Sequence, residues 1–253
     1  MGSLYLFDAK GRERWVFKPG REIVSGDKTF SSDFVIPGFV IHDFDKDRHP
    51  EIVILAHAFN QYPTRFILLD AKKNILGDFW NAGRFADVHF ADLNRDDQEE
   101  ILLAGQKYEY QRPCLIIMDW KNVKGCSPQG PAFAFNGLAP GSEKLNILFP
   151  RTAVDEIKKS DISLWKVGVL SNERIQVASA PSEIFFELDF LGGFLSAILS
   201  HSYDLQYNEF LKQGLIKLPY DDSRIRRELE AGFQYYDGAA KAWVPRRANA
   251  NAW

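Results

Sequence analysis

The chain has 253 residues, of which 45% are hydrophobic and 26% charged, so it can bury a core as one or two domains. Its 31 basic and 34 acidic side chains give a formal net charge of −3, which supplies no global attraction to nucleic acid or to an anionic membrane. Two cysteines, Cys114 and Cys126, are too few for a disulfide framework. The longest apolar run, residues 190–199, is far shorter than the roughly 20 residues of a membrane-spanning helix. We therefore expect no nucleic-acid partner and no membrane insertion.

The chain begins with the pattern of a strand, an aspartate, a turn and a second strand. Residues 4–8 are Leu-Tyr-Leu-Phe-Asp, and the apolar residues Trp15 and Val16 follow after a polar turn. A similar order of residue types recurs at residues 66–72. The chain is therefore expected to open halfway through a repeating unit and to be a piece of a longer protein.

The central part of the chain contains an internal repeat of 49 residues. The acidic segment that begins at Asp43 returns at Asp92, and 92 − 43 = 49. The apolar run that ends at Asp70 returns before Asp119, with the same offset because 119 − 70 = 49. Repeats of 20 to 50 residues are typical of stacked units that cannot bury their faces alone.

Each repeat contains short β-branched and aromatic runs that are bounded by polar turns, which predicts strands. Four short strands in about 50 residues are typical of a propeller blade. A degenerate unit is expected over about residues 145–200, where a strand at 184–189 ends in an aspartate and a glycine turn. In the two clear repeats, strands are predicted at 36–42, 51–57, 64–70 and 75–80, and at 86–91, 100–106, 113–119 and 131–136.

The C-terminal part changes in character. Residues 203–211 and 222–231 have helical spacing, and residues 235–244 form a candidate last hairpin. The predicted fold is an all-β, propeller-like array of about four four-stranded blades, one incomplete and one degenerate, over residues 1–200, with a small helical appendage over residues 201–253. Because an open array exposes sheet edges, we expect a homo-oligomer or fusion to a missing domain.

Two acidic loops lie between predicted strands. In both loops, side-chain oxygens stand at loop positions one, three, five and nine, which a tight loop can turn onto one hard cation. Ligands that are all oxygen favour calcium over zinc or copper. The competing interpretation is that these turns only bond their own backbone, as Asp and Asn do. The candidate ligands are Asp43, Asp45, Asp47 and Glu51 in the first loop and Asp92, Asn94, Asp96 and Glu100 in the second.

These loops resemble those of the FG-GAP, or VCBS, repeats of integrin-α-like β-propellers, whose blades carry Asp-x-Asp-x-Asp-Gly-x-x-Asp before an apolar strand. The resemblance covers roughly residues 36–136. It implies a propeller fold, structural calcium on the eight loop residues, and an extracytoplasmic or cell-surface location. The sequence departs from the family at two places in each loop. Arg48 or Asp97 replaces the glycine, where a left-handed backbone suits Asp better than Arg, and the ninth residue is Glu instead of Asp.

A loop between two strands of the second repeat carries aromatic and polar groups that could contact a partner. It contains Tyr108, Tyr110 and Arg112, and Tyr62 lies at a comparable place in the first repeat. Ordinary turn packing is the alternative use of these side chains.

The sequence favours a non-catalytic binding or sensing module that displays propeller loops to a protein or glycan partner, with structural calcium. No catalytic residue is assigned. The alternative is a propeller enzyme, a hydrolase or lyase acting on polysaccharide, which would need a pocket where ionisable side chains converge. A regulatory segment fused to a missing output domain is a third interpretation.

Overall fold

The computed structural model describes residues 2–59, 62–159 and 161–245, and the regular structure in them consists mostly of strands. The fold is therefore all-β in character. The chain forms two compact units. The first contains the residues up to Phe85 together with Met118–Glu143, and the second contains Ala86–Ile117 together with the residues from Lys144 onward.

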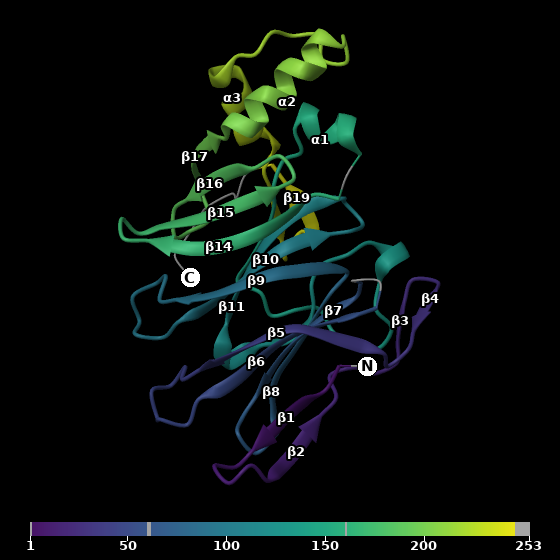
Figure 1. Cartoon of the computed structure of the whole chain (residues 1–253), viewed down its shortest axis with the longest axis vertical. Helices are drawn as coiled ribbons and strands as arrows, with labels where there is room; N and C mark the ends of the chain where they lie inside the picture. Colours follow the sequence, from purple (N-terminus) through teal and green to yellow (C-terminus); the bar gives the residue numbers. More distant parts are fainter. Residues whose placement is uncertain (1, 60–61, 160, 246–253) are drawn as a thin grey trace. The chain divides into compact units, whose positions relative to one another are not determined.

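The first unit is built on a five-stranded sheet in the order β12-β8-β7-β6-β5 (Figure 1). Strands β5 to β8 follow one another as an antiparallel meander, and β12 joins β8 in parallel. Strands β1 and β2, and β3 and β4, form two separate hairpins. The elements are β1 (Leu4–Phe7), β2 (Glu13–Phe17), β3 (Ile23–Ser25), β4 (Lys28–Phe30), β5 (Phe34–His42), β6 (Glu51–Ala58), β7 (Thr64–Leu69), β8 (Ile75–Asn81), β12 (Lys124–Cys126) and the 3-10 turns η1 (Trp120–Asn122) and η2 (Pro131–Phe133).

The second unit contains a six-stranded sheet in the order β19-β18-β13-β11-β10-β9 and a four-stranded meander in the order β14-β15-β16-β17. Helices α1, α2 and α3 complete it (Figure 1). Its elements are β9 (Gly83–Ala91), β10 (Glu100–Lys107), β11 (Arg112–Asp119), β13 (Leu145–Leu148), α1 (Ala153–Lys158), β14 (Ser163–Leu170), β15 (Arg174–Ala180), β16 (Ile184–Leu188), β17 (Phe194–Leu199), α2 (His201–Lys212), α3 (Asp222–Gly232), β18 (Gln234–Asp237) and β19 (Ala242–Val244).

Burial explains why the central strands have almost continuous apolar runs. Every residue of β6, β7 and β10 is buried, because these strands are covered on both faces of their sheets. In the second unit, side chains from the two sheets share one core, with Leu102 of β10, Val167 of β14 and Phe186 of β16 among its members. Two sheets therefore pack face to face within this unit.

The hairpins confirm the predicted pattern of strand, aspartate and turn. Asp8, Asp70 and Asp189 each follow a strand, and Oδ1 of each accepts two backbone hydrogen bonds from its own turn. The residue three positions later is left-handed each time, with φ of 75° at Gly11, 71° at Lys73 and 81° at Gly192. The N-terminal pair of strands and the β7–β8 hairpin therefore use the same turn.

One predicted strand is wrong. Residues 131–136 do not form the fourth strand of the second repeat, because Pro131, which has no amide donor, begins the turn η2 instead. The fourth strand is β13, which pairs with β11 and begins at Leu145. The segment between β11 and β13 supplies β12 to the sheet of the first unit.

The two predicted C-terminal helices are present as α2 and α3, which begin after the capping residues Ser200 and Asp221. The predicted last hairpin is also present, as β18 and β19, and it pairs with β13 in the second unit. No helix in the described part of the chain is long and apolar enough to cross a bilayer. None of the sheets formed by the described residues closes into a ring.

The turn after Asp70 predicts a stabilising substitution. Lys73 carries a side chain in the left-handed region, whereas glycine occupies the same place in the other two turns. Lys73→Gly should raise the free energy of unfolding by about 0.5 to 1 kcal/mol, measured by urea denaturation. Lys72→Gly is the matched control and should lower it slightly, because position 72 lacks a positive φ. Equal effects at both positions would contradict this account of the turn.

Candidate metal centre

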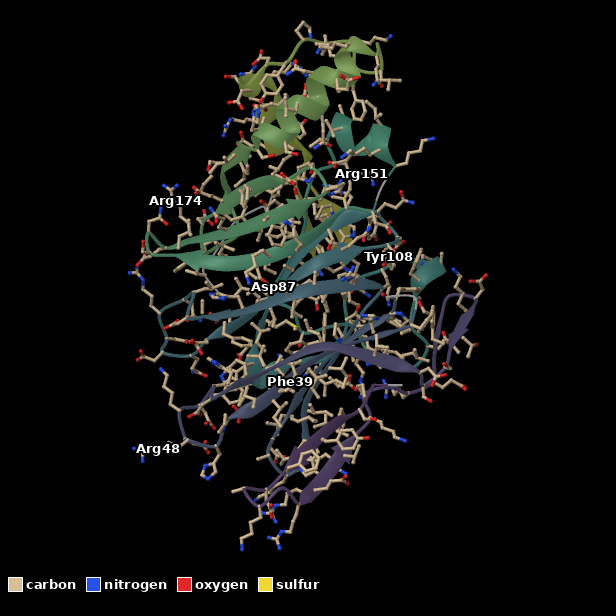
Figure 2. The ribbon with its side chains drawn as sticks, viewed as in Figure 1. Phe39, Arg48, Asp87, Tyr108, Arg151 and Arg174 are labelled. Atoms are coloured by element: carbon tan, nitrogen blue, oxygen red, sulfur yellow. The ribbon has the colours of Figure 1, made fainter. Side chains whose placement is uncertain are left out.

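The first acidic loop joins β5 to β6 and is closed by its own carboxylates. Oδ1 of Asp43 accepts a hydrogen bond from the Asp47 amide at 3.1 Å, and Oδ2 accepts one from the Arg48 amide at 2.9 Å. The backbone is left-handed at Lys46 (φ 61°) and at Arg48 (φ 71°). Figure 2 shows Arg48 at the tip of this loop. The sixth residue of this loop therefore has a left-handed backbone although it is an arginine.

The second acidic loop, between β9 and β10, repeats this network. Oδ1 of Asp92 accepts from the Asp96 amide at 3.2 Å, and Oδ2 accepts from the Asp97 amide at 3.0 Å. The left-handed residues are again the fourth and the sixth, with φ of 63° at both Arg95 and Asp97. The 49-residue repeat is thus a repeat of conformation as well as of sequence.

Glu51, the first residue of β6, is hydrogen-bonded to the backbone of the first loop. Its side chain is buried, with the residue 6% exposed, and Oε2 accepts a hydrogen bond from the Phe44 amide at 3.1 Å. Burial raises the pKa of this carboxyl, the Phe44 amide opposes that rise, and the negative charges of Asp45 and Asp43 add to it. A cation beside Glu51 would offset both the cost of burying its negative charge and the repulsion from the two aspartates.

Three of the four predicted ligands in the first loop converge. One carboxylate oxygen each of Asp43, Asp45 and Glu51 lies within 4.8 Å of the other two. Over the described ranges, this is the only such group of three acidic, histidine or cysteine side chains. Hard carboxylate oxygens at this spacing fit calcium. Asp47 is not in this group, and its Oδ1 accepts a hydrogen bond from the His49 amide at 2.7 Å.

The predicted ligands of the second loop have other hydrogen-bond and ion-pair partners than those of the first loop. Oε2 of Glu100 accepts from the Leu93 amide at 2.9 Å, as Glu51 does from Phe44, but its Oε1 lies 2.9 Å from Nζ of Lys144. Asn94 stands where the first loop has Asp45, and its amide group donates to Asp96. Nothing in the local spacing of the loop indicates Lys144, which is 44 residues away along the chain.

Tyr62 is buried in the first unit and its hydroxyl is used internally. It lies 2.6 Å from the hydroxyl of Ser25, and its ring makes edge contacts with Phe30 and Phe133. These contacts give Tyr62 a structural role in the core of the first unit.

The other three partner candidates lie in the second unit around the β10–β11 turn, where Figure 2 labels Tyr108. Tyr110 is partly buried with its ring edge-on to Trp243, and burial raises the pKa of its hydroxyl. Arg112 binds backbone carbonyls of Phe149 (2.7 Å), Leu148 (3.3 Å) and Gly232, and the side chain of Gln234 (2.6 Å). Burial, with a smaller contribution from Arg151, lowers the pKa of Arg112 to about 10. Arg112 thus joins β11 to the end of β13, to the end of α3 and to the start of β18.

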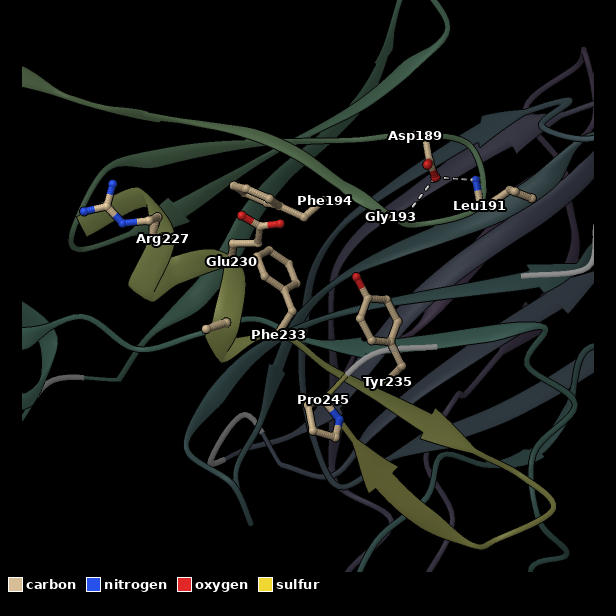
Figure 3. Close-up of a pocket in the computed structure, with 10 residues that line it drawn as sticks. Asp189, Leu191, Gly193, Phe194, Arg227, Glu230, Phe233, Tyr235 and Pro245 are labelled. Atoms are coloured by element: carbon tan, nitrogen blue, oxygen red, sulfur yellow. Dashed lines mark hydrogen bonds between the residues drawn. The ribbon is translucent and has the colours of Figure 1, made fainter. Parts of the chain in front are cut away.

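A cavity of about 790 Å³ lies beside α3 in the second unit. Figure 3 shows the rings of Phe194, Phe233 and Tyr235 lining it, with Glu230 projecting from α3. The carboxylate of Asp189 also faces it, but Oδ1 is held by the amides of its own turn at 2.7 and 2.9 Å. Three of its ten lining residues are aromatic, and three are acidic or basic, namely Asp189, Arg227 and Glu230.

No family model, no curated protein and no solved structure matches the chain. Function is therefore inferred from the chain's own residues.

The packing of Arg112 predicts a structural role that lysine cannot fill. Arg112→Lys keeps the charge but loses the planar guanidinium that reaches several acceptors. The substitution should therefore lower the free energy of unfolding by about 2 kcal/mol, measured by urea denaturation. Arg174→Lys is the control, because Arg174 forms one ion pair with Glu187 at 2.7 Å near the surface. If Arg112→Lys were as mild as this control, the guanidinium would be available to a partner.

Proposed function

We propose that this chain is a non-catalytic binding module made of propeller-like blades of the FG-GAP or VCBS type, with a structural calcium ion in the first acidic loop. The observation that carries the proposal is the convergence of Asp43, Asp45 and Glu51 within 4.8 Å. The fitted donor set is entirely oxygen, and it belongs to a loop whose conformation recurs 49 residues later.

The arrangement of strands supports the blade interpretation. Strands β5 to β8 form one antiparallel meander, and β14 to β17 form another, with the first strand at an edge of its sheet in both cases. Within the second unit, β14 and β10 contribute to one core between two sheets. Successive four-stranded sheets that pack face to face are the architecture of a propeller.

Strand β5 supports a role in binding. It is an edge strand of its sheet, and its apolar side chains Phe39 and Ile41 are 52% and 59% exposed. Figure 2 labels Phe39 on this strand. An apolar edge strand offers backbone donors and acceptors together with hydrophobic contacts, which suits a protein partner, including a second copy of the chain. Calcium loops of modest affinity are common in extracellular modules, so an extracytoplasmic or cell-surface location accompanies the proposal.

The calcium site predicts a metal-dependent gain in stability. Thermal melts in chelator and in millimolar calcium should differ, with a gain of about 2.7 kcal/mol once free calcium exceeds Kd a hundredfold. Asp45→Asn should remove most of this gain and leave the melt in chelator nearly unchanged. Asparagine can still accept the Asp47 amide, as Asn94 does from Asp96 at 3.0 Å.

Two controls accompany this test. Magnesium at the same concentration separates calcium binding from charge screening, and Asp27→Asn makes the same change of charge at an exposed turn of the same unit. A calcium effect that survives in Asp45→Asn, or its absence in the unaltered protein, would contradict the site.

The edge strand predicts concentration-dependent self-association. Sedimentation velocity over a dilution series should show a species heavier than the monomer at high concentration. Ile41→Lys should abolish it, because a charge on an edge strand opposes strand pairing. Ile75→Lys, at a residue 49% exposed on β8, is the control and should leave association intact. A monomer at every concentration would exclude the second copy as the partner.

A further inference from the structure

The two acidic loops differ in how their buried glutamates are neutralised. Glu100 is buried and forms an ion pair with Lys144, whose side chain is only 24% exposed. In the described part of the chain, no basic side chain lies within ion-pair distance of Glu51, Asp43 or Asp45. The two loops share a backbone conformation, but only the glutamate of the second loop has a basic side chain beside it among the described residues.

Strand register identifies the residue of the first repeat that corresponds to Lys144. In the second repeat Ile117 of β11 pairs with Leu145, directly after Lys144. In the first repeat Leu68 of β7 pairs with Gly77, directly after Leu76. Since 117 − 68 = 49, the two strand pairs are in the same phase of the repeat. Leu76 thus has the sequence position in the first repeat that Lys144 has in the second, although the pairing shifts beside it, since Leu69 pairs with Ile75. It is 46% exposed.

The chemistry of the pair matches that of a bound cation. An ammonium group 2.9 Å from a buried carboxylate supplies the positive charge that a metal ion would otherwise bring. At the four candidate ligand positions, the second loop also has one carboxylate fewer, because Asn94 stands at the position of Asp45. A divalent ion entering this loop would have to displace Lys144 and would find a weaker set of ligands.

We propose that the Lys144 ammonium occupies, in the second loop, the place that a metal ion takes in the first, so that the chain binds one divalent cation and not two. The claim about the first loop rests on the proposed function. The ion pair between Lys144 and Glu100 does not depend on whether the first loop binds a metal ion. The second loop is therefore a metal-independent copy of a calcium loop.

A reciprocal exchange tests the proposal. Lys144→Met removes the ammonium but keeps the length of the stem, and Leu76→Lys places an ammonium at the corresponding position of the first repeat. Calcium titration calorimetry and thermal melts, in chelator and in calcium, are carried out on both variants and on the unaltered protein. The unaltered protein should bind one equivalent. Lys144→Met should bind two, and Leu76→Lys should bind none.

The melts distinguish exchange of cations from a simple loss of packing. In chelator, Lys144→Met should lower Tm by about 5 °C, because it leaves a buried carboxylate unpaired. Calcium should restore at least half of that loss. Two equivalents in the unaltered protein, or one equivalent in Lys144→Met with no recovery in calcium, would overturn the proposal.

One further variant separates failure of this inference from failure of the proposed function. If the unaltered protein binds no calcium, the metal role of the first loop is wrong, and the ion pair is judged in chelator alone. Lys144→Met combined with Glu100→Gln then removes both charges, and Tm should recover toward that of the unaltered protein. A double variant as unstable as Lys144→Met would show that Lys144 acts through packing and would overturn the assignment.

Discussion

A carboxylate buried at the head of a central strand must be given hydrogen-bond donors and positive charge, because burying it without them is costly. Glu51 and Glu100 stand at that place, and each accepts the backbone amide of the residue seven positions earlier. This bond ties the acidic loop to the strand that follows it. The hydrogen bond does not neutralise the negative charge of the glutamate. In the second repeat Lys144 supplies a positive charge to Glu100. In the first repeat Glu51 lies close to two further carboxylates, Asp43 and Asp45.

Both acidic loops have a left-handed backbone at their sixth residue, although neither has glycine there. Arg48 holds a left-handed backbone that favours glycine, at a cost of about 1 kcal/mol. Its amide donates to the Asp43 carboxylate at 2.9 Å, and a charge-assisted hydrogen bond of this kind offsets such a cost. The left-handed conformation at the sixth loop position therefore does not require glycine.

Local sequence patterns predicted most of the strands but not the pairing of charges. The strands of the first repeat begin and end within about two residues of their predicted limits, because each is a short apolar run between polar turns. Residues 131–136 failed because Pro131 begins a turn and the true fourth strand lies after a long excursion. Lys144 could not be connected with Glu100 from spacing, since only the pairing of β11 with β13 brings it there. The burial of Tyr62 likewise depends on Phe133, far away in sequence.

The first loop and the apolar edge strand belong to one hairpin, which relates the two parts of the proposed function. Strand β5 is an edge strand that pairs with β6, and this pairing is irregular between Val35 and Gly38. The carboxylates of Asp43, Asp45 and Glu51 lie at the opposite end of that hairpin, where a cation would join the two strands through their shared loop. Binding there would favour the ordered state of β5 and with it the exposed residues Phe39 and Ile41. In the second repeat the buried Glu100 is instead paired with Lys144, which lies directly before β13. Under the proposed function, the effect of calcium would therefore be confined to the repeat that carries the apolar edge.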